Sequence, residues 1–384
     1  MEISREILTR VTILDISVIL MYIIGIVALA QKFRDVSVRF VRLFALVGIT
    51  HLFFTFVYYF YTLNNVADSI GYYRRVLYWF DNWGETFGQG VYFIYFSLYP
   101  LIKFFGFTYF GSFFIYSFLG LLGYYYLQKV LMDITNYKWT NWFYLLLLPN
   151  IHFWSVAIGK DSLIFFAISL LLYSYYFKKP WHKYIIPLLI IAFIRIHILF
   201  FLLISFGMMQ LLLNKKIKVI NKVLIFLFLG LTFYILFPFL MQRIGFVDTE
   251  SILSQVEDLE NIKVKGGSTV DMTGKNLLVK WLSYLFRPLF YDAGNVLGII
   301  VSLENLFWIL IFLNIIRKFK DKIFETFRNI YWFCFFSIFT ITVPAAYLLY
   351  NLGIAIRQKT MIIPFLFTLL FLILYKKVDF KKRI

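Results

Sequence analysis

The stretch Pro149-Asn150-Ile151-His152-Phe153-Trp154-Ser155-Val156-Ala157-Ile158-Gly159-Lys160-Asp161-Ser162-Leu163 decides how this chain folds. Apolar and aromatic residues run on both sides of it for most of the protein, and two opposite charges stand in its middle. A charge at the centre of a bilayer costs roughly 2.5–3.5 kcal/mol on insertion scales. Lys160 and Asp161 therefore predict that the chain surfaces briefly here, or that both side chains line a polar cavity.

The composition indicates an integral membrane protein. Of the 384 residues, 61% are hydrophobic and only 15% are charged, and the mean hydropathy is +0.79. Soluble domains are about half apolar and about a quarter charged. We therefore expect an all-α, polytopic fold in which residues 1–384 form a single transmembrane domain. The first apolar segment lacks a cleavage pattern and predicts a retained helix rather than a signal peptide.

The net charge of +18 does not indicate a nucleic-acid partner, because the basic residues fall in short loops between apolar runs and serve to orient helices. A single cysteine, Cys334, excludes a disulfide framework and a cysteine-based metal site. The four histidines show no metal-ligand spacing, so no protein-built metal site and no cofactor are predicted. A divalent metal that neutralises a phosphate is possible, but nothing in the sequence indicates one.

Apolar runs that approach the roughly 20 residues needed to cross a bilayer recur along the chain. Val91–Gly106 is too short to cross easily and contains Pro100, so it predicts a re-entrant or interfacial segment. Residues 184–213 fit either one long helix or two half-spans that turn at Arg195-Ile196-His197. The predicted crossings are Thr12–Gln31, Leu43–Leu63, Phe110–Gln128, Trp142–Ile158, Ser162–Phe177, Val223–Met241, Ala293–Ile316, Asn329–Leu349 and Thr360–Tyr375.

Basic loops set the orientation, because Lys and Arg concentrate on the cytoplasmic side. If the 32–42 loop and the C-terminal tail are cytoplasmic, sides alternate throughout, provided that 184–213 is a hairpin. This gives about 11 crossings, with the N-terminus outside and the C-terminus inside. Residues 64–90 become the first extracytoplasmic loop, and 242–292 a large excursion that ends in an amphipathic interfacial stretch, Leu277–Phe290. Polar residues scattered along the sequence then meet on one face: Asp68, Lys160, Asp161, Arg195, His197, Arg357 and Lys359.

Ionisable residues at membrane depth are functional candidates. Asp68 fits a general base for a hydroxyl nucleophile, a metal ligand, or simply the N-cap of a helix. Lys160 and Asp161 fit either a mutual ion pair or a phosphate site at a helix start. Arg195 suits a phosphate or the Asp161 carboxylate, because its guanidinium is a planar fork.

The remaining cations have interfacial interpretations as well. Arg287 is expected at head-group level, and Arg357 and Lys359 either snorkel at the interface or bind a lipid phosphate. Glu304 lies inside a predicted span and needs a partner.

Several of these features together resemble membrane glycosyltransferases of the GT-C superfamily and polysaccharide repeat-unit polymerases of the O-antigen type. The resemblance rests on an acid followed by tyrosines in the first outer loop, a charged pair after Trp-Ser at an outer helix junction, half-helices around a histidine, and an arginine before a last, Pro-containing helix. These residues are Asp68, Tyr72, Tyr73, Trp154, Ser155, Lys160, Asp161, His197, Arg357 and Pro364.

The resemblance implies a donor sugar on a polyprenyl phosphate or diphosphate, used at the extracytoplasmic face. Asp68 would deprotonate the acceptor, and Asp161 or Asp271 would supply a second acid. Tyr72 and Tyr73 would stack on sugars. Cations would hold the phosphate, with membrane lipid around them: Lys160, Arg195, His197, Arg287, Arg357 and Lys359.

Three other classes compete with a glycosyltransferase: a repeat-unit polymerase, a transporter or lipid flippase, and a purely structural membrane subunit. A transporter commonly shows repeats with discontinuous helices, and the two halves of this sequence show no repeat. The Lys-, Ile- and Phe-rich composition fits a bacterium with an AT-rich genome, and we expect a multi-pass protein of its cytoplasmic membrane. The sequence does not identify a protein partner.

Overall fold

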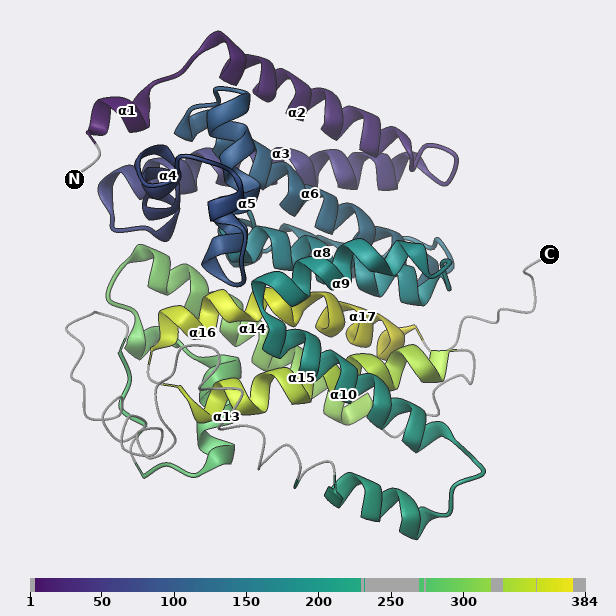
Figure 1. Ribbon diagram of the computed structural model, residues 1–384. Coiled ribbons are helices and arrows are strands. Elements are labelled where there is room, and N and C mark those ends of the chain that lie inside the picture. Colours follow the sequence, from purple (N-terminus) through teal and green to yellow (C-terminus); the bar gives the residue numbers. More distant parts are fainter. Residues whose placement is uncertain are drawn as a thin grey trace. The chain divides into compact units, whose positions relative to one another are not determined.

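The computed structural model describes residues 4–228, 231, 269–272, 274–318, 327–349 and 351–375, without the side chains of 314–318. The predicted all-α fold is confirmed: these residues form helices, and one isolated bridge joins Thr269 and Asn351 (Figure 1). The chain divides into two compact units. The first comprises Met1–Ile196 with Leu374–Ile384, and the second comprises His197–Ile373.

Within the described residues, six helices are long and apolar enough to cross a membrane, which supports a membrane protein. Five of them match predicted crossings, and the sixth, α10, forms the second half of 184–213. The six are α2 (Ile13–Gln31), α3 (Val38–Asn64), α6 (Tyr109–Ile134), α10 (Ile196–Leu213), α14 (Val296–Lys318) and α15 (Arg328–Tyr347).

The prediction of one crossing helix over Trp142–Ile158 is wrong. A 3₁₀ helix, η3 (Asn141–Leu147), is followed by the seven-residue α7 (Pro149–Ser155). Proline disfavours a helical conformation in the residue before it, and Leu148 is extended, with φ −60° and ψ 125°. The helix therefore stops and restarts at Pro149.

The predicted last crossing, Thr360–Tyr375, is also interrupted. The short α16 (Leu352–Gln358) and η6 (Lys359–Met361) precede α17 (Ile363–Leu374), and the chain bends by 62° between them. Of the predicted Val223–Met241 crossing and the 242–292 excursion, residues 229–230, 232–268 and 273 lie outside the described part of the chain. The amphipathic stretch of that excursion begins with a helix, α13 (Leu277–Phe286).

The first unit is built on α2, α3, α6 and α8 (Lys160–Tyr176), with α9 (His182–Ile194) against α8 and the short α1 (Arg5–Thr9) at its start. Two glycines of α6 allow close approach. A Cβ on Gly123 would lie 2.7 Å from the Phe165 ring of α8, and one on Gly120 would lie 2.1 Å from the Ser155 carbonyl oxygen. α6 therefore lies close to α7 and α8 at these two glycines, and a larger residue at either position would push the helices apart.

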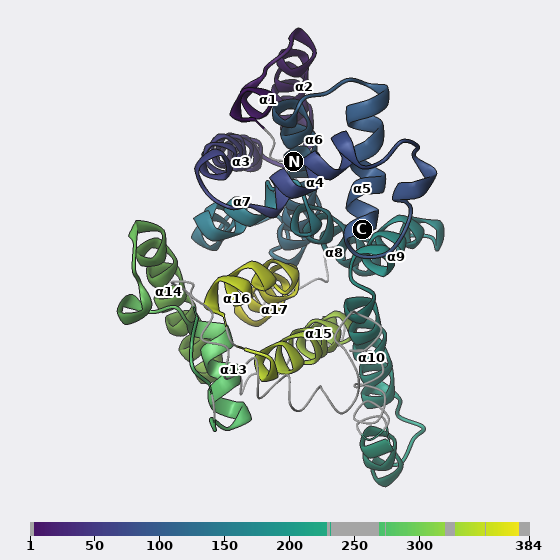
Figure 2. The ribbon, with the colours of Figure 1, turned by 60° about the vertical axis from the view of Figure 1, so that its left-hand side comes forward.

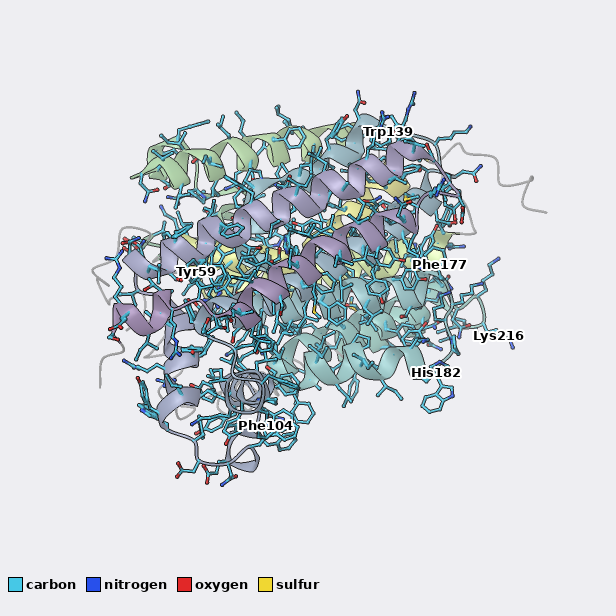
Figure 3. The ribbon with its side chains drawn as sticks, turned by 90° about the horizontal axis from the view of Figure 1, so that it is seen from above. Tyr59, Phe104, Trp139, Phe177, His182 and Lys216 are labelled. Carbon is cyan, nitrogen blue, oxygen red and sulfur yellow. The ribbon has the colours of Figure 1, made fainter. Side chains whose placement is uncertain are left out.

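Three basic loops lie at one end of the first unit. Phe40 contacts Trp139 with ring centroids 5.8 Å apart, and the Tyr176 hydroxyl donates to Asp133 at 2.8 Å. Figure 3 shows Trp139, Phe177 and His182 toward one end of the helices and Tyr59 toward the other. This matches the prediction that the loops after α2, α6 and α8 share a side.

The start of α8 is recessed inside the first unit. Gly123 lies fourteen residues from the start of α6 and is level with Phe165, five residues from the start of α8. Since both helices run toward the basic end, α8 begins about 14 Å deeper than α6, at 1.5 Å per residue.

A segment between α4 (Asp68–Tyr78) and α6 doubles back on itself. It contains η1 (Gly84–Thr86), α5 (Val91–Tyr99) and the π-helical turn η2 (Pro100–Phe104). The Tyr99 hydroxyl donates to the Asp81 carbonyl at 2.7 Å, and Trp83 Nε1 donates to the Phe96 carbonyl at 2.8 Å. Gly90 is the tip, with φ +68°, a conformation that favours glycine. Residues 81–104 thus fold back on themselves, and we call them the re-entrant segment after the prediction for Val91–Gly106; their re-entrant or interfacial placement stays a prediction.

The second unit contains α10, α13, η4 (Phe290–Asp292), α14, α15, α16 and α17 (Figure 2). Its core joins α13, the end of α15 and α16 through Met272, Tyr284, Ala346, Leu349, Leu352 and Ala355. Trp281 of α13 donates its indole N–H to Thr342 of α15 at 2.8 Å.

Candidate functional site

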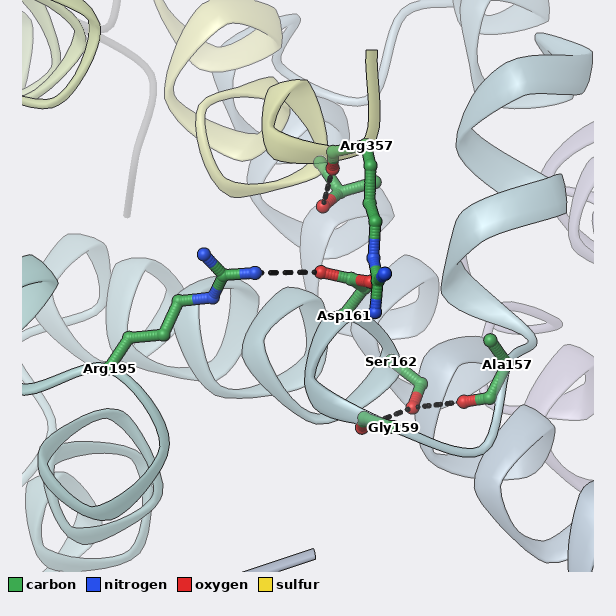
Figure 4. A network of polar contacts seen from close by, with 7 residues as sticks. Ala157, Gly159, Asp161, Ser162, Arg195 and Arg357 are labelled. Atoms are coloured by element: carbon green, nitrogen blue, oxygen red, sulfur yellow. Dashed lines mark hydrogen bonds and ion pairs between the residues drawn. The ribbon is translucent and has the colours of Figure 1, made fainter. Parts of the chain in front are cut away.

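Asp161 and Arg195 form a buried ion pair in the first unit (Figure 4). Arg195 Nη2 donates to Asp161 Oδ1 at 3.2 Å, and the side chains are 14% and 1% exposed. Of the two partners that the sequence offers Arg195, the structure shows the carboxylate. A pair this well shielded from solvent is electrostatically strong, and the loss of either member leaves an uncompensated charge.

Backbone breaks bring these two residues together. Gly159 has a positive φ of 156°, with ψ −160°, a conformation that favours glycine, and Asp161 follows in the first turn of α8, where the helix dipole favours a carboxylate. Ser162 Oγ donates to the Ala157 carbonyl at 2.8 Å and fixes this turn (Figure 4). Arg195 ends α9 with φ −147° and ψ 75°. The break at Arg195 that the half-span prediction requires is therefore present, while the hairpin over 184–213 stays a prediction.

Lys160 stands beside the tip of the re-entrant segment. The Gly90 N–H donates to the Phe193 carbonyl at 2.6 Å, and a Cβ on Gly90 would lie 3.9 Å from Lys160 Nζ. We refer to Lys160, Asp161 and Arg195 as the recessed charged cluster. It lies at the end of α8 and α9 opposite the basic loops and combines two cations with one carboxylate.

Asp68 is the first residue of α4, and the N-cap is Ala67, which makes no side-chain capping bond. The N-cap interpretation of Asp68 is therefore wrong. Tyr72 and Tyr73 are buried, at 7% and 4% exposure, rather than presented on a surface. Tyr72 contacts Tyr95 and Tyr73 contacts Tyr109, and burial, followed by the nearby Asp15, raises the pKa of Tyr73 to about 12.

In the second unit, Arg287 is held by Asp292. Arg287 Nε donates to Asp292 Oδ2 at 3.0 Å and Nη2 donates to Oδ1, so the guanidinium fork is engaged. A hydrogen bond to Asp292 raises the pKa of Arg287. Burial raises the pKa of Asp292, but the bonds from Arg287 and from the Leu289 N–H outweigh it, and the pKa lies below its usual value.

Lys359 is also buried, at 7% exposure. Its Nζ donates to the Asn305 side-chain oxygen at 3.0 Å and to the Arg287 carbonyl at 3.2 Å. Glu304 is close enough to interact with it electrostatically, which gives Glu304 the partner that its position requires. Lys359 therefore ties η6 to α14 and to the turn after α13.

The other candidates are spread over the second unit. Arg357 is half-buried on α16, and its carbonyl accepts a bond from Thr360 at 2.8 Å. His197 follows the break on α10 and contacts the Phe201 ring, and Asp271 is exposed. The first unit thus joins Lys160, Asp161 and Arg195, and the second joins Arg287 with Lys359.

Sequence reasoning missed two buried polar groups in the first unit. Asp15 is fully buried and accepts bonds from Thr12 and Thr108, and His51 contacts His152. The signal for both was a polar residue inside a predicted span. No protein-family model, no curated protein and no solved structure matches this chain.

Proposed function

We propose that this protein is an integral membrane glycosyltransferase of cell-surface polysaccharide or glycolipid assembly. It would transfer sugar from a polyprenyl-(di)phosphate donor at the extracytoplasmic face of a bacterial cytoplasmic membrane. The observation that supports this most is the recessed charged cluster, where two cations and a carboxylate lie below the end of an apolar bundle. A lipid-linked phosphate reaches such a place without leaving the membrane.

The chemistry of the cluster suits a phosphate leaving group. Lys160 and Arg195 would bind the phosphate and stabilise the charge that develops on it during transfer. Asp161 would orient Arg195 through the ion pair. A carboxylate must also take the proton of the acceptor hydroxyl, and Asp68 on α4 is assigned that role. No nucleotide or resident cofactor is required.

Sugar transfer by the purified full-length protein in nanodiscs tests this proposal. The donor is a polyprenyl-diphosphate-linked monosaccharide, and transfer to acceptor saccharides is measured. Asp68→Asn should lower transfer about 10²–10⁴-fold if it removes the base. Asp35→Asn and Lys138→Gln are matched controls, because both change an exposed charge in a basic loop. Transfer by Asp68→Asn at the control rate would overturn the base assignment.

A charge-swap variant separates binding from folding. In the double variant Asp161→Arg and Arg195→Asp the ion pair persists with reversed polarity, so thermal stability should recover relative to each single variant. Transfer should stay lost, because the phosphate-binding cation has moved to the other side of the pair. A double variant with full activity would show that the pair is purely structural.

A repeat-unit polymerase would use the same cluster with a larger acceptor, and lipid-linked oligosaccharide as acceptor in the same assay distinguishes it. A transporter or flippase is favoured by a different observation, the interrupted helices at Arg195 and between α16 and α17. Movement of labelled donor across vesicles, without sugar transfer, would support that class instead.

A further inference from the structure

His51 of α3 and His152 of α7 form a histidine pair inside the first unit. Both side chains are completely buried. Their Nδ1 atoms are 2.9 Å apart. The remaining nitrogens face carbonyl oxygens: His51 Nε2 lies 3.0 Å from Ser117 O, and His152 Nε2 lies 2.9 Å from Leu146 O. All four ring nitrogens therefore stand at hydrogen-bond distance from a partner.

Hydrogen bonds in all three contacts at once require three hydrogens. A carbonyl oxygen only accepts, so each Nε2 must carry its proton, and the Nδ1–Nδ1 contact needs one hydrogen between its nitrogens. Two neutral imidazoles carry two N–H groups in total. If both were neutral, either two nitrogen lone pairs would face each other at 2.9 Å, or one carbonyl would face a lone pair at about the same separation.

The backbone explains why the two carbonyl bonds are made. In a 3₁₀ helix the Leu146 carbonyl would accept from the residue three positions on, but that residue is Pro149, which has no N–H. His152 Nε2 donates to this carbonyl instead. On the other side, Gly120 keeps α6 open to His51, since a Cβ there would lie 2.9 Å from His51 Nε2.

We propose that His51 and His152 together hold one proton more than two neutral imidazoles carry, shared between their Nδ1 atoms. The pair is then a proton-binding site with a charge of +1. This assignment does not depend on the proposed function.

Aromatic rings surround this charge. Tyr124 of α6 stacks on His152 with centroids 4.5 Å apart at 10°, and Phe54 of α3 lies parallel to His152 at 5.8 Å. Cation–π attraction is strongest in such desolvated places. Among titratable groups, Tyr124 contacts the His51 ring, and Tyr22 of α2 is connected to the pair through Ser117. Thr55 of α3 adds a hydroxyl to the same network, 2.6 Å from Ser117 Oγ.

The shared proton holds α7 against α3. α7 leads directly through Val156–Gly159 to Lys160 and Asp161, so the position of α7 sets the start of α8. If the proton leaves, two lone pairs face each other and this contact becomes repulsive. Protonation of the pair is therefore expected to stabilise α7 and the turn that presents the recessed charged cluster.

Counting the hydrogens tests the proposal without a ligand. The full-length protein in nanodiscs is labelled with ¹⁵N-histidine, and its four histidines give a small set of signals. His182→Gln and His197→Gln assign the two histidines outside the pair. We expect both Nε2 atoms of the pair to be protonated and a nitrogen–nitrogen coupling between the Nδ1 atoms. Two unprotonated nitrogens in the pair, without that coupling, would overturn the proposal.

A second measurement uses hydrogen exchange of the same protein. Residues 149–155 should exchange faster, relative to α8, once the pH is raised until the Nδ1 coupling disappears. His152→Gln lacks the shared proton. In this variant the ratio of the hydrogen-exchange rate of α7 to that of α8 should not change over the same range of pH. Equal pH dependence in wild type and His152→Gln would contradict the link between the proton and α7.

Discussion

Single residues in this protein owe their chemistry to where a helix is interrupted. Asp161 follows a glycine with a positive φ, and Arg195 stands where α9 ends, so two charges meet that no continuous helix would bring together. Lys359 occupies a comparable place in the second unit, in the 3₁₀ turn before α17. Charges at such breaks have partners supplied by neighbouring backbone and side chains, which offsets the cost of their burial.

Asp292 gives a pH-dependent prediction at this scale. Its pKa is lower in the folded protein than its ordinary value of 3.8. The unfolded chain therefore binds more protons at this group, and its stabilising effect is present above that value and lost as the pH falls through the folded pKa. Asp292→Asn should lower stability near neutral pH by about 1–3 kcal/mol, because a charge-assisted bond is lost. It should also flatten the acid limb of the stability curve.

Thermal unfolding in detergent at a series of pH values measures both effects. Asp35→Asn is the control, since Asp35 is exposed and its replacement should leave the curve unchanged. An unchanged acid limb in Asp292→Asn would show that the Arg287–Asp292 pair adds nothing to stability.

At the scale of elements, Thr108 joins two helices through one hydroxyl. It accepts from the Gly111 N–H at 3.4 Å as the N-cap of α6, and it donates to Asp15 of α2 at 3.0 Å. Thr108→Val keeps the shape and removes both bonds, so we expect a loss of about 1–3 kcal/mol. Thr108→Ser keeps the hydroxyl and should lose much less. Thermal unfolding compares the two variants, and equal stability would exclude the hydroxyl as the connection.

The elements also show how far sequence reasoning reached. Long apolar runs such as Ile13–Gln31 and Arg328–Tyr347 were predictable, because burial in lipid demands length and hydrophobicity alone. The break inside the predicted Trp142–Ile158 crossing was not predictable from hydropathy. A hydropathy scale takes no account of the N–H that Pro149 lacks or of the constraint that Pro149 places on Leu148. The pairing of Asp161 with Arg195 was offered as one of two alternatives. The contact of His51 with His152 joins residues 101 positions apart and needed the structure.

For the whole molecule, the orientation of the helices is the main prediction left to test. On a Cys334→Ser background, which removes the one buried cysteine, single cysteines replace the exposed residues Asp35, Asn82, Lys138, Lys216 and Asn295. An impermeant thiol reagent added to intact cells should label positions 82 and 295. Positions 35, 138 and 216 should react only after permeabilisation. Labelling of position 138 from outside would invert the topology of the first unit.

The re-entrant segment 81–104 has a consequence for how such a chain can diversify. Its two limbs lie side by side, so a segment that enters the membrane as predicted would add no crossing and would leave the orientation of the later helices unaltered. Residues can be inserted into or deleted from its two limbs without turning any downstream loop to the opposite side of the membrane. Its Gly90 tip lies beside Lys160, so insertions and deletions in this segment would alter the surroundings of the recessed charged cluster. If the recessed charged cluster binds the donor as proposed, variation in substrate choice is expected to concentrate in this segment, while α2, α3, α6 and α8 stay constant.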